Sequence, residues 1–299
     1  MANYNNLSTL SGLKVGDVVT YTVAQSINLK KYKVKVELYG VATTANGGYT
    51  TFTLDPKSLS NQYFYWTSDY GSSLMYDKNQ AATSRTAYYR IGVAGDAGTI
   101  GTYFTPGAGG GSTGGNGGSS TRYAENAGGG TQTTGGTGAA VVISGAYSRA
   151  GSNGTFGTGG TGGQYGTNTA RYGGNGGNGW YGGGGGAQTY LSGNFYDSYP
   201  GGGGSGFAIG QSTTTYPSGY MGDNSSDITA LTAAVSNATL TQGGSSESSA
   251  KMVLTILELP ISFPKYYNGS AWVDTVWKRY NGTSWEDIEV KYYNGSSWT

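Results

Sequence analysis

The chain has 299 residues, of which 57 are Gly and 27 are Tyr, with no Cys and no His. The absence of Cys excludes disulfides and thiol nucleophiles, and the absence of His excludes a Ser-His-Asp triad and the commonest transition-metal ligand. Seventeen basic and 16 acidic residues give a formal net charge of +1, which argues against nucleic-acid binding through a basic surface. We therefore expect neutral partners, no cofactor, no bound metal, and a function that does not respond to pH between about 5 and 8.

The N-terminal residues 1–6 (Met-Ala-Asn-Tyr-Asn-Asn) lack the basic and apolar regions of a secretory signal. No apolar run reaches the roughly 18 to 20 residues that a membrane helix needs. We expect a protein that is made in a cytoplasm, is not inserted into a membrane, and reaches the outside by lysis within an assembled particle.

Residues 1–95 are predicted to form β-strands separated by turns. The run 32–39 alternates Lys and Glu with Val and Leu, a period of two that predicts one buried and one solvent-facing side. The other runs of this character are 18–23, 49–54, 62–67 and 86–93. An antiparallel β-sandwich frame is the fold class that this pattern favours, with an apolar run at 251–259 returning to the first sheet.

Residues 96–250 form the glycine-rich domain, and residues 101–210 alone hold 41 of the 57 Gly. A disordered linker is one interpretation, but 14 aromatic residues and only five charges in 101–210 favour an ordered one. Collagen needs Gly at every third position and abundant Pro, and an α-helix loses about 1 kcal/mol per Gly. An extended threefold helix resembling polyproline II remains, in which chains without Cβ atoms approach and hydrogen-bond to one another. The glycines expected to pack in this way are Gly182, Gly183, Gly184, Gly185, Gly186, Gly201, Gly202, Gly203 and Gly204.

A short helix is predicted at 227–235, with Ser226 or Asp227 as the N-cap. The preceding run 222–227 carries two Asp residues, but its spacing is not that of a calcium loop. A turn or a helix cap is therefore the preferred interpretation.

Residues 261–299 contain three copies of a motif that recurs every 13 residues, at 265–272, 278–285 and 291–298. The Asn-Gly pair in each copy predicts a β-hairpin with a two-residue turn, which would place Lys265 opposite Trp272. Such small hairpins are marginal alone, so we expect them to bury their aromatic residues in an assembly contact. The residues expected to do so are Trp272, Trp285, Trp298, Tyr267, Tyr280 and Tyr293.

The order of motifs resembles the glycine-rich domains of bacteriophage tail proteins over roughly residues 14–259. The residues that carry this resemblance are Tyr-Lys-Val-Lys-Val-Glu-Leu-Tyr-Gly (32–40), Gly-Gly-Tyr-Thr-Thr-Phe-Thr-Leu (47–54), Tyr-Tyr-Arg-Ile-Gly-Val-Ala-Gly (88–95), Trp-Tyr-Gly-Gly-Gly-Gly-Gly (180–186) and Gly-Gly-Gly-Gly-Ser-Gly-Phe (201–207). The arrangement is also similar to the glycine-rich extracellular region of anaplastic lymphoma kinase-type receptors. The resemblance implies polyglycine helices held beside β-strands. The chain departs from these domains after Gly40, which Val-Ala-Thr-Thr-Ala follows, and at Asp96, where more Gly is usual.

The repeated Tyr-Asn-Gly-x-x-Trp tail is similar to structural proteins of phages that infect Gram-positive hosts, and receptor kinases lack it. This resemblance implies a virion protein, most simply a tail or fibre adhesin that binds a host-surface glycan or protein as a homo-oligomer together with other virion proteins. A purely structural virion role and a polysaccharide-degrading tail enzyme are the alternatives, and we expect no catalysis. The loop between two poly-Gly runs is the candidate receptor-binding surface, through Tyr190, Phe195, Tyr196 and Tyr199.

Overall fold

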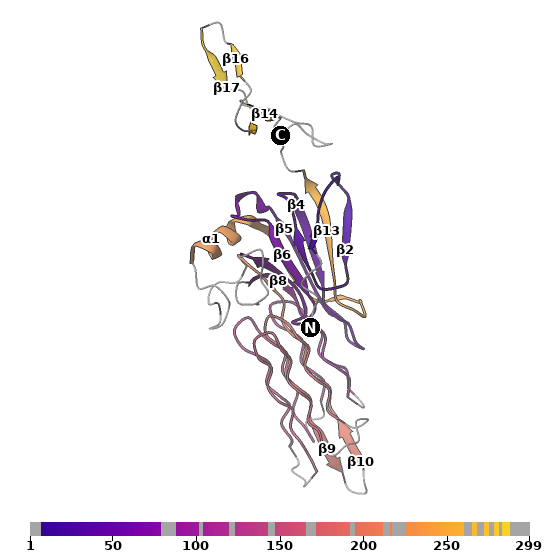
Figure 1. Cartoon of the computed structure of the whole chain (residues 1–299). Helices are drawn as coiled ribbons and strands as arrows, with labels where there is room; N and C mark the ends of the chain where they lie inside the picture. The colour runs from indigo at the N-terminus through magenta and orange to yellow at the C-terminus, as the bar shows by residue number, and fades with distance from the viewer. Residues whose placement is uncertain are drawn as a thin grey trace.

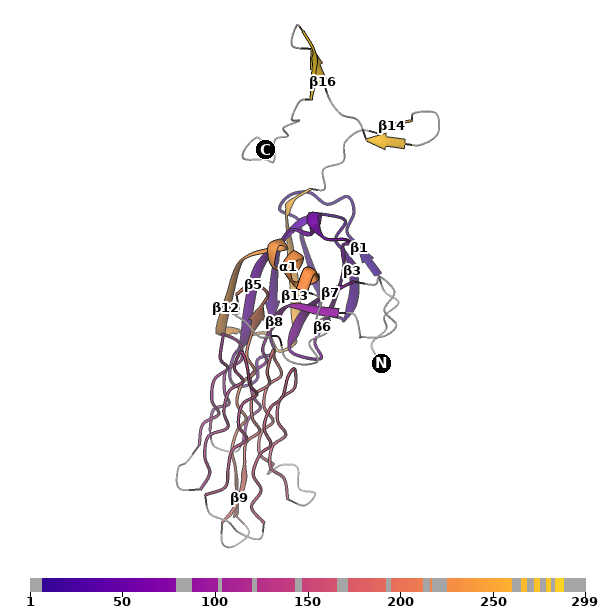
Figure 2. The same cartoon turned by 90° about the vertical axis from the view of Figure 1, so that its left-hand side faces the viewer.

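The computed structural model is mainly β, with antiparallel sheets, as the sequence predicts. It describes residues 7–78, 88–101, 104–119, 123–142, 147–165, 172–191, 195–211, 216, 225–259, 265–267, 272–274, 278–280 and 283–287. Two sheets lie face to face, and the glycine-rich region (residues 95–206) extends from one end of them (Figures 1 and 2).

The first sheet has six strands in the order β1-β3-β6-β7-β8-β11. The first pair, β1 and β3, is parallel, whereas the other neighbours are antiparallel. The strands of this sheet are β1 (Leu7–Thr9), β3 (Gln25–Asn28), β6 (Tyr63–Thr67), β7 (Ser72–Asp77), β8 (Tyr88–Ala94) and β11 (Phe207–Ala208).

The second sheet has five antiparallel strands in the order β12-β5-β4-β13-β2. Strand β13 lies between β2 and β4 and pairs with both, so the chain returns to the first strands after the glycine-rich region. The strands are β2 (Val18–Tyr21), β4 (Lys33–Tyr39), β5 (Gly47–Leu54), β12 (Val235–Ser245) and β13 (Lys251–Glu258). Each run expected as a strand overlaps one. The sequence pattern did not reveal β12, nor β1, β3, β7 and β11 of the first sheet.

The core lies between the two sheets because the strands alternate. In β4, Val34, Val36 and Leu38 are fully buried, and their neighbours on the other face are partly exposed. On that outer face, the carboxylate of Glu258 forms an ion pair of 2.6 Å with Lys33. It forms a second ion pair, of 2.7 Å, with Lys57 of the short 3-10 helix η1 (Pro56–Ser58). The alternation therefore determines both the apolar interior and the charged outer face.

The one α-helix of the described residues, α1 (Ser225–Ala234), begins two residues earlier than expected. Asp227 consequently lies in the first helical turn and is not the N-cap. Its carboxylate accepts hydrogen bonds from Lys78 and from the hydroxyl of Tyr89, and so ties the helix to β7 and β8. Leu231 on the same helix is fully buried against the sandwich core.

The glycine-rich region consists mostly of extended segments outside any sheet that run back and forth along its length (Figures 1 and 2). Hydrogen bonds between their backbones link one segment to another. In segment 182–186, residues three positions apart donate to the same neighbouring segment: Gly182 and Gly185 to Thr155 and Ser152, Gly183 and Gly186 to Gly177 and Gly174, and Gly184 to Gly128.

The carbonyl groups of segment 182–186 follow the same period of three but point to different neighbours. Their donors are Gly136 and Ala139 for Gly182 and Gly185, Gly160 and Gly163 for Gly183 and Gly186, and Gly202 for Gly184. Segment 201–204 behaves likewise, since Gly201 and Gly204 both donate to segment 96–99. These two glycine runs are therefore surrounded by hydrogen-bonded backbone, and the nine glycines predicted to be structural are all buried.

The strands of the C-terminal residues correct one expectation about register. β14 (Lys265–Tyr267) pairs with β15 (Trp272–Asp274) so that Tyr267 lies opposite Trp272. β16 (Lys278–Tyr280) and β17 (Trp285–Asp287) pair in the same way. Four residues, and not two, separate the paired strands, and Lys265 lies opposite Asp274. The third copy of the motif, with Tyr293 and Trp298, lies outside the described residues.

Candidate functional site

The end of the glycine-rich region farthest from the sheets carries a two-stranded sheet of β9 (Gln188–Leu191) and β10 (Phe195–Ser198) (Figures 1 and 2). The segment that contains Arg149 lies beside β9, because Arg149 and Gln188 exchange backbone hydrogen bonds of 2.8 Å in both directions. Residues distant in sequence therefore meet at this end of the molecule.

Three tyrosines and one arginine form a cluster here, which we call the tip cluster: Tyr147, Arg149, Tyr165 and Tyr190. The ring of Tyr147 packs edge-on against Tyr165 and Tyr190, with centroid distances of 4.7 and 5.1 Å. The guanidinium carbon of Arg149 lies 4.8 Å from the centroid of Tyr165, a cation–π geometry. Tyr147 is 39% exposed and Arg149 is also exposed, so the cluster presents ring surface and a positive charge to solvent.

Hydrogen bonds from neighbouring segments hold the backbone of two tyrosines of the cluster in place. The buried side chain of Gln188 accepts a 2.6 Å hydrogen bond from the backbone amide of Tyr165. The hydroxyl of Ser148 accepts one of 3.0 Å from the amide of Tyr190. Two tyrosines of the tip cluster are thus positioned by neighbouring segments, which makes the cluster a preorganised surface.

Tyr199, one of the four predicted receptor-binding residues, does not belong to this surface. It is 1% exposed and stacks on Phe104 with a centroid distance of 5.3 Å and an interplanar angle of 14°. Burial raises the pKa of its hydroxyl. The residue fills the interior of the far end among four alanines, Ala124, Ala127, Ala139 and Ala187. The prediction that Tyr199 contacts a receptor is therefore wrong, because packing removes its ring from solvent.

Of the other three predicted receptor-binding residues, the structure places one, Tyr190, in the tip cluster. Tyr190 lies opposite Tyr196 in the β9–β10 pair. Phe195 and Tyr196 are described only as backbone positions of β10.

Sequence reasoning missed Tyr147, Arg149 and Tyr165, which lie up to about 40 residues before the predicted loop. A signal for them exists in the sequence, because Tyr147 and Tyr165 are among the aromatic residues that interrupt the Gly-rich segments. Only the order in which the segments lie beside one another shows that these side chains contact Tyr190 and one another.

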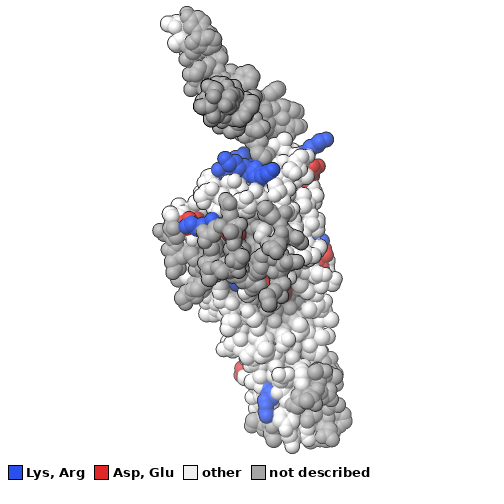
Figure 3. Space-filling model, viewed as in Figure 1, with Lys and Arg blue, Asp and Glu red and all other residues white. Residues whose placement is uncertain are grey.

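In the view of Figure 3, few charged side chains lie on the described surface of the glycine-rich region. Within the described part of the glycine-rich region beyond residue 100, the charged residues are Glu125, Arg149 and Asp197. Burial raises the pKa of Asp197. The described residues contain no group of three Asp or Glu that could hold a metal ion. Exposed rings beside one guanidinium suit stacking and hydrogen bonding to a largely neutral surface.

Comparisons of the chain with protein families, curated proteins and solved structures find no match. No helix among the described residues has the length and apolar character required to cross a bilayer. The function must therefore be inferred from the geometry of the chain.

Proposed function

We propose that the protein is a structural component of a bacteriophage particle, a tail or fibre adhesin that binds a host-surface receptor without catalysis. The exposed tip cluster carries this proposal. Tyrosine supplies rigid, amphipathic contact area at a small cost in conformational entropy, and tyrosine and arginine are common among the residues that dominate binding energies. The cluster also lies at the end of the glycine-rich region that carries β9 and β10, away from the β-sandwich (Figure 1).

We further propose that the glycine-rich region is a bundle of polyglycine II helices. Such a helix has three residues per turn, so residues i and i+3 face the same neighbour. The donor partners of segment 182–186 repeat with this period, and its backbone groups address six different segments in total. A bundle of this kind would act as a stiff support that holds the tip cluster away from the sandwich.

In this proposal the C-terminal residues 261–299 serve assembly. Each of the two described strand pairs places a Tyr opposite a Trp, an arrangement that suits burial against a copy of the chain or another virion protein. The protein would be made in the bacterial cytoplasm, built into the virion, and released by lysis. It needs no cofactor, nucleic acid or membrane insertion for this role.

The test is binding of the fluorescently labelled protein to a panel of Gram-positive bacterial cells. We expect Tyr147→Ala and Arg149→Ala each to weaken binding to the recognised strain at least tenfold, the size of effect found for central interface residues. Tyr63→Ala and Lys30→Ala, which change the same residue classes on the β-sandwich, should leave binding within about twofold.

Three outcomes would contradict the proposal. Equal binding by the tip variants and the parent would move the receptor site elsewhere. Normal particles combined with no binding to any strain by the isolated protein would favour a purely structural virion role. Release of reducing sugar from cell-wall polysaccharide would indicate the third class, a tail enzyme.

A further inference from the structure

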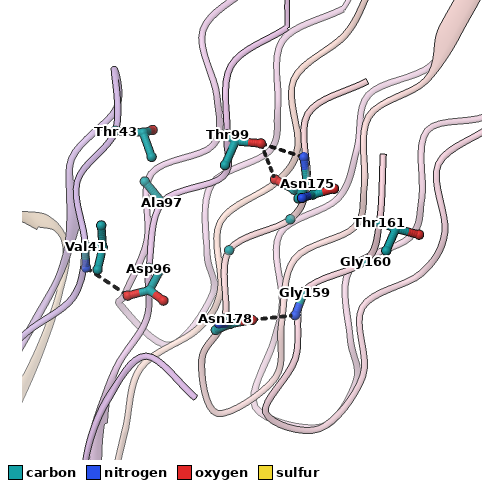
Figure 4. Close-up of a pocket in the computed structure, with 12 residues that line it drawn as sticks. Val41, Thr43, Asp96, Ala97, Thr99, Gly159, Gly160, Thr161, Asn175 and Asn178 are labelled. Atoms are coloured by element: carbon teal, nitrogen blue, oxygen red, sulfur yellow. Dashed lines mark hydrogen bonds between the residues drawn. The ribbon is translucent and has the colours of Figure 1, made fainter. Parts of the chain in front are cut away.

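A groove of about 330 Å³ opens on the side of the glycine-rich region, where it joins the β-sandwich (Figure 4). Its walls are residues 96–99 on one side, 175–178 at the centre and 159–161 on the other side, with Val41 and Thr43 at one end. The volume lies at the lower end of the roughly 300 to 1,000 Å³ typical of small-molecule sites. The groove is separate from the tip cluster and shares no residue with it.

Asp96 gives the groove its one ionisable side chain. Its Oδ1 atom accepts a 2.8 Å hydrogen bond from the backbone amide of Val41, and no other described residue bonds to the carboxylate. Figure 4 shows the second carboxylate oxygen turned away from Val41 toward Asn178. Burial raises the pKa of Asp96 to about 7 although the hydrogen bond from Val41 lowers it, and no charged side chain contributes to the shift. Above pH 7 Asp96 is therefore an ionised acceptor without a counter-charge at the groove.

Two asparagines on the central wall supply the complementary groups. The Oδ1 atoms of Asn175 and Asn178 accept hydrogen bonds from the amides of Gly162 and Gly159 at 2.9 and 3.0 Å. An amide side chain carries two N–H donors besides its acceptor. The Nδ2 groups of both asparagines form no hydrogen bond to the described residues and remain available as donors. The groove thus offers an acceptor on one wall and donors on the next, over a floor of glycine backbone.

We infer that this groove binds a neutral carbohydrate. A sugar hydroxyl both donates and accepts, so neighbouring hydroxyls can satisfy Asp96 and the asparagine amides at the same time. A primary amine would match Asp96 alone and would leave the asparagine donors unmatched, which costs binding energy. No aromatic ring lines the groove, so we expect a weak interaction, with a dissociation constant in the millimolar range.

The test uses the full chain at about pH 8.5, where Asp96 is ionised, with N-acetylglucosamine and galactose as probes and n-butylamine as the amine. Chemical shifts of the amide groups of residues 159–160 and 176–177 report occupancy of the groove. We expect saturable shifts with at least one sugar. Asp96→Asn keeps the Oδ1 acceptor and the shape of the side chain but replaces the second acceptor with a donor. Asn175→Asp keeps its Oδ1 acceptor but replaces the donor with an acceptor. Each variant should weaken sugar binding at least tenfold. Glu125→Gln, which removes an exposed carboxylate elsewhere, should bind like the parent.

The inference is overturned if neither sugar causes saturable shifts at these amides, or if both groove variants bind as the parent does. Saturable binding of n-butylamine in place of the sugars would also overturn it. Thermal unfolding of each variant identifies a loss of folding. These outcomes are independent of cell binding through the tip cluster, so either proposal can fail while the other holds.

Discussion

At the scale of single residues, glycine is required where one backbone lies directly on another. A Cβ atom added at Gly184 would overlap the carbonyl group of Thr137, and one added at Gly203 would overlap that of Ala108. Backbone atoms cannot move aside as the end of a flexible side chain can. The benefit of glycine in this region is therefore close approach, which compensates for its large loss of conformational entropy on folding.

We expect Gly184→Val to destabilise the protein by more than about 4 kcal/mol or to prevent folding, because the side chain would force two hydrogen-bonded segments apart. Gly12→Ala is the control. Gly12 has a φ of 67° but open space around it, so only the left-handed strain of about 1 to 2 kcal/mol should appear. Urea unfolding of both variants measures the difference. Equal stability of Gly184→Val and the parent would show that the segments are not packed as described.

Asp96 bears on the expectation that the function does not respond to pH between about 5 and 8, because it is a group other than His that titrates in this range. The absence of His removes the usual group, but desolvation moves the pKa of this carboxyl from 3.8 to about 7. No sequence pattern marks the position, because the shift arises from the glycine segments and the Val41 amide that surround it.

Between pH 4 and pH 7 the folded state keeps the proton of Asp96 while the unfolded state has lost it. Stability therefore falls as pH rises through this window, by at most about 4 kcal/mol, and by less because the carboxyl is partly exposed. Asp96→Asn keeps the acceptor for Val41 and does not titrate. We expect the variant to gain stability relative to the parent from pH 4 to pH 8 and the gain to level off above pH 7. Thermal midpoints across this range measure it, and a constant difference would contradict the raised pKa.

At the scale of elements, an aromatic stack joins the glycine-rich region to the β-sandwich. Trp180 is 1% exposed and stacks on Phe207 of β11, with a centroid distance of 3.8 Å and an interplanar angle of 9°. Phe156 packs edge-on against the same indole at 4.9 Å, and the indole N–H donates to the carbonyl of Gln132. The side chain of Trp180 thus joins strand β11 to the segments of the glycine-rich region that contain Phe156 and Gln132.

Trp180→Ala should therefore cost about 3 to 5 kcal/mol, the range for removal of a large buried aromatic side chain. Trp180→Phe retains a stacked ring and loses the hydrogen bond to Gln132, so about 1 to 3 kcal/mol is expected. Chemical denaturation provides both values, and protease digestion shows whether the glycine-rich region opens first. Similar costs for the two variants would mean that stacking on Phe207 contributes little.

At the scale of the whole molecule, the glycine-rich region and the C-terminal strands leave the β-sandwich by different strands. The glycine-rich region follows β8 and ends at β11, both in the first sheet, whereas the C-terminal residues follow β13 in the second sheet. This separation would allow one part to face a receptor while another joins a particle, as our proposal requires.

A chain ending at Leu259 tests the assembly role of the tail. Because isolated two-stranded hairpins are marginal in water, we expect their aromatic residues to be buried in contacts between chains. The shortened chain should keep the thermal midpoint of the β-sandwich but lose self-association, as measured by light scattering, and incorporation into particles. If it assembles as the full chain does, residues 261–299 serve instead as a second binding surface.

The sequence by itself determined the class of the fold and the places where glycine is indispensable. Alternation at 32–39 predicted a buried strand face, because a period of two is a local property of an extended chain, and the apolar run 251–259 predicted a returning strand. The poly-Gly runs 182–186 and 201–204 identified buried backbone that other segments approach closely, because only residues without Cβ atoms permit such close approach.

Only the tertiary structure decided which segments are neighbours. Strand β12, the burial of Tyr199, the meeting of Tyr147 with Tyr190, and the raised pKa of Asp96 all depend on contacts between residues far apart in the chain. In the glycine-rich region the segments resemble one another, so composition does not distinguish their possible lateral arrangements. Their order is set by backbone hydrogen bonds between segments, which carry no side-chain signature, and the candidate sites arise from that order.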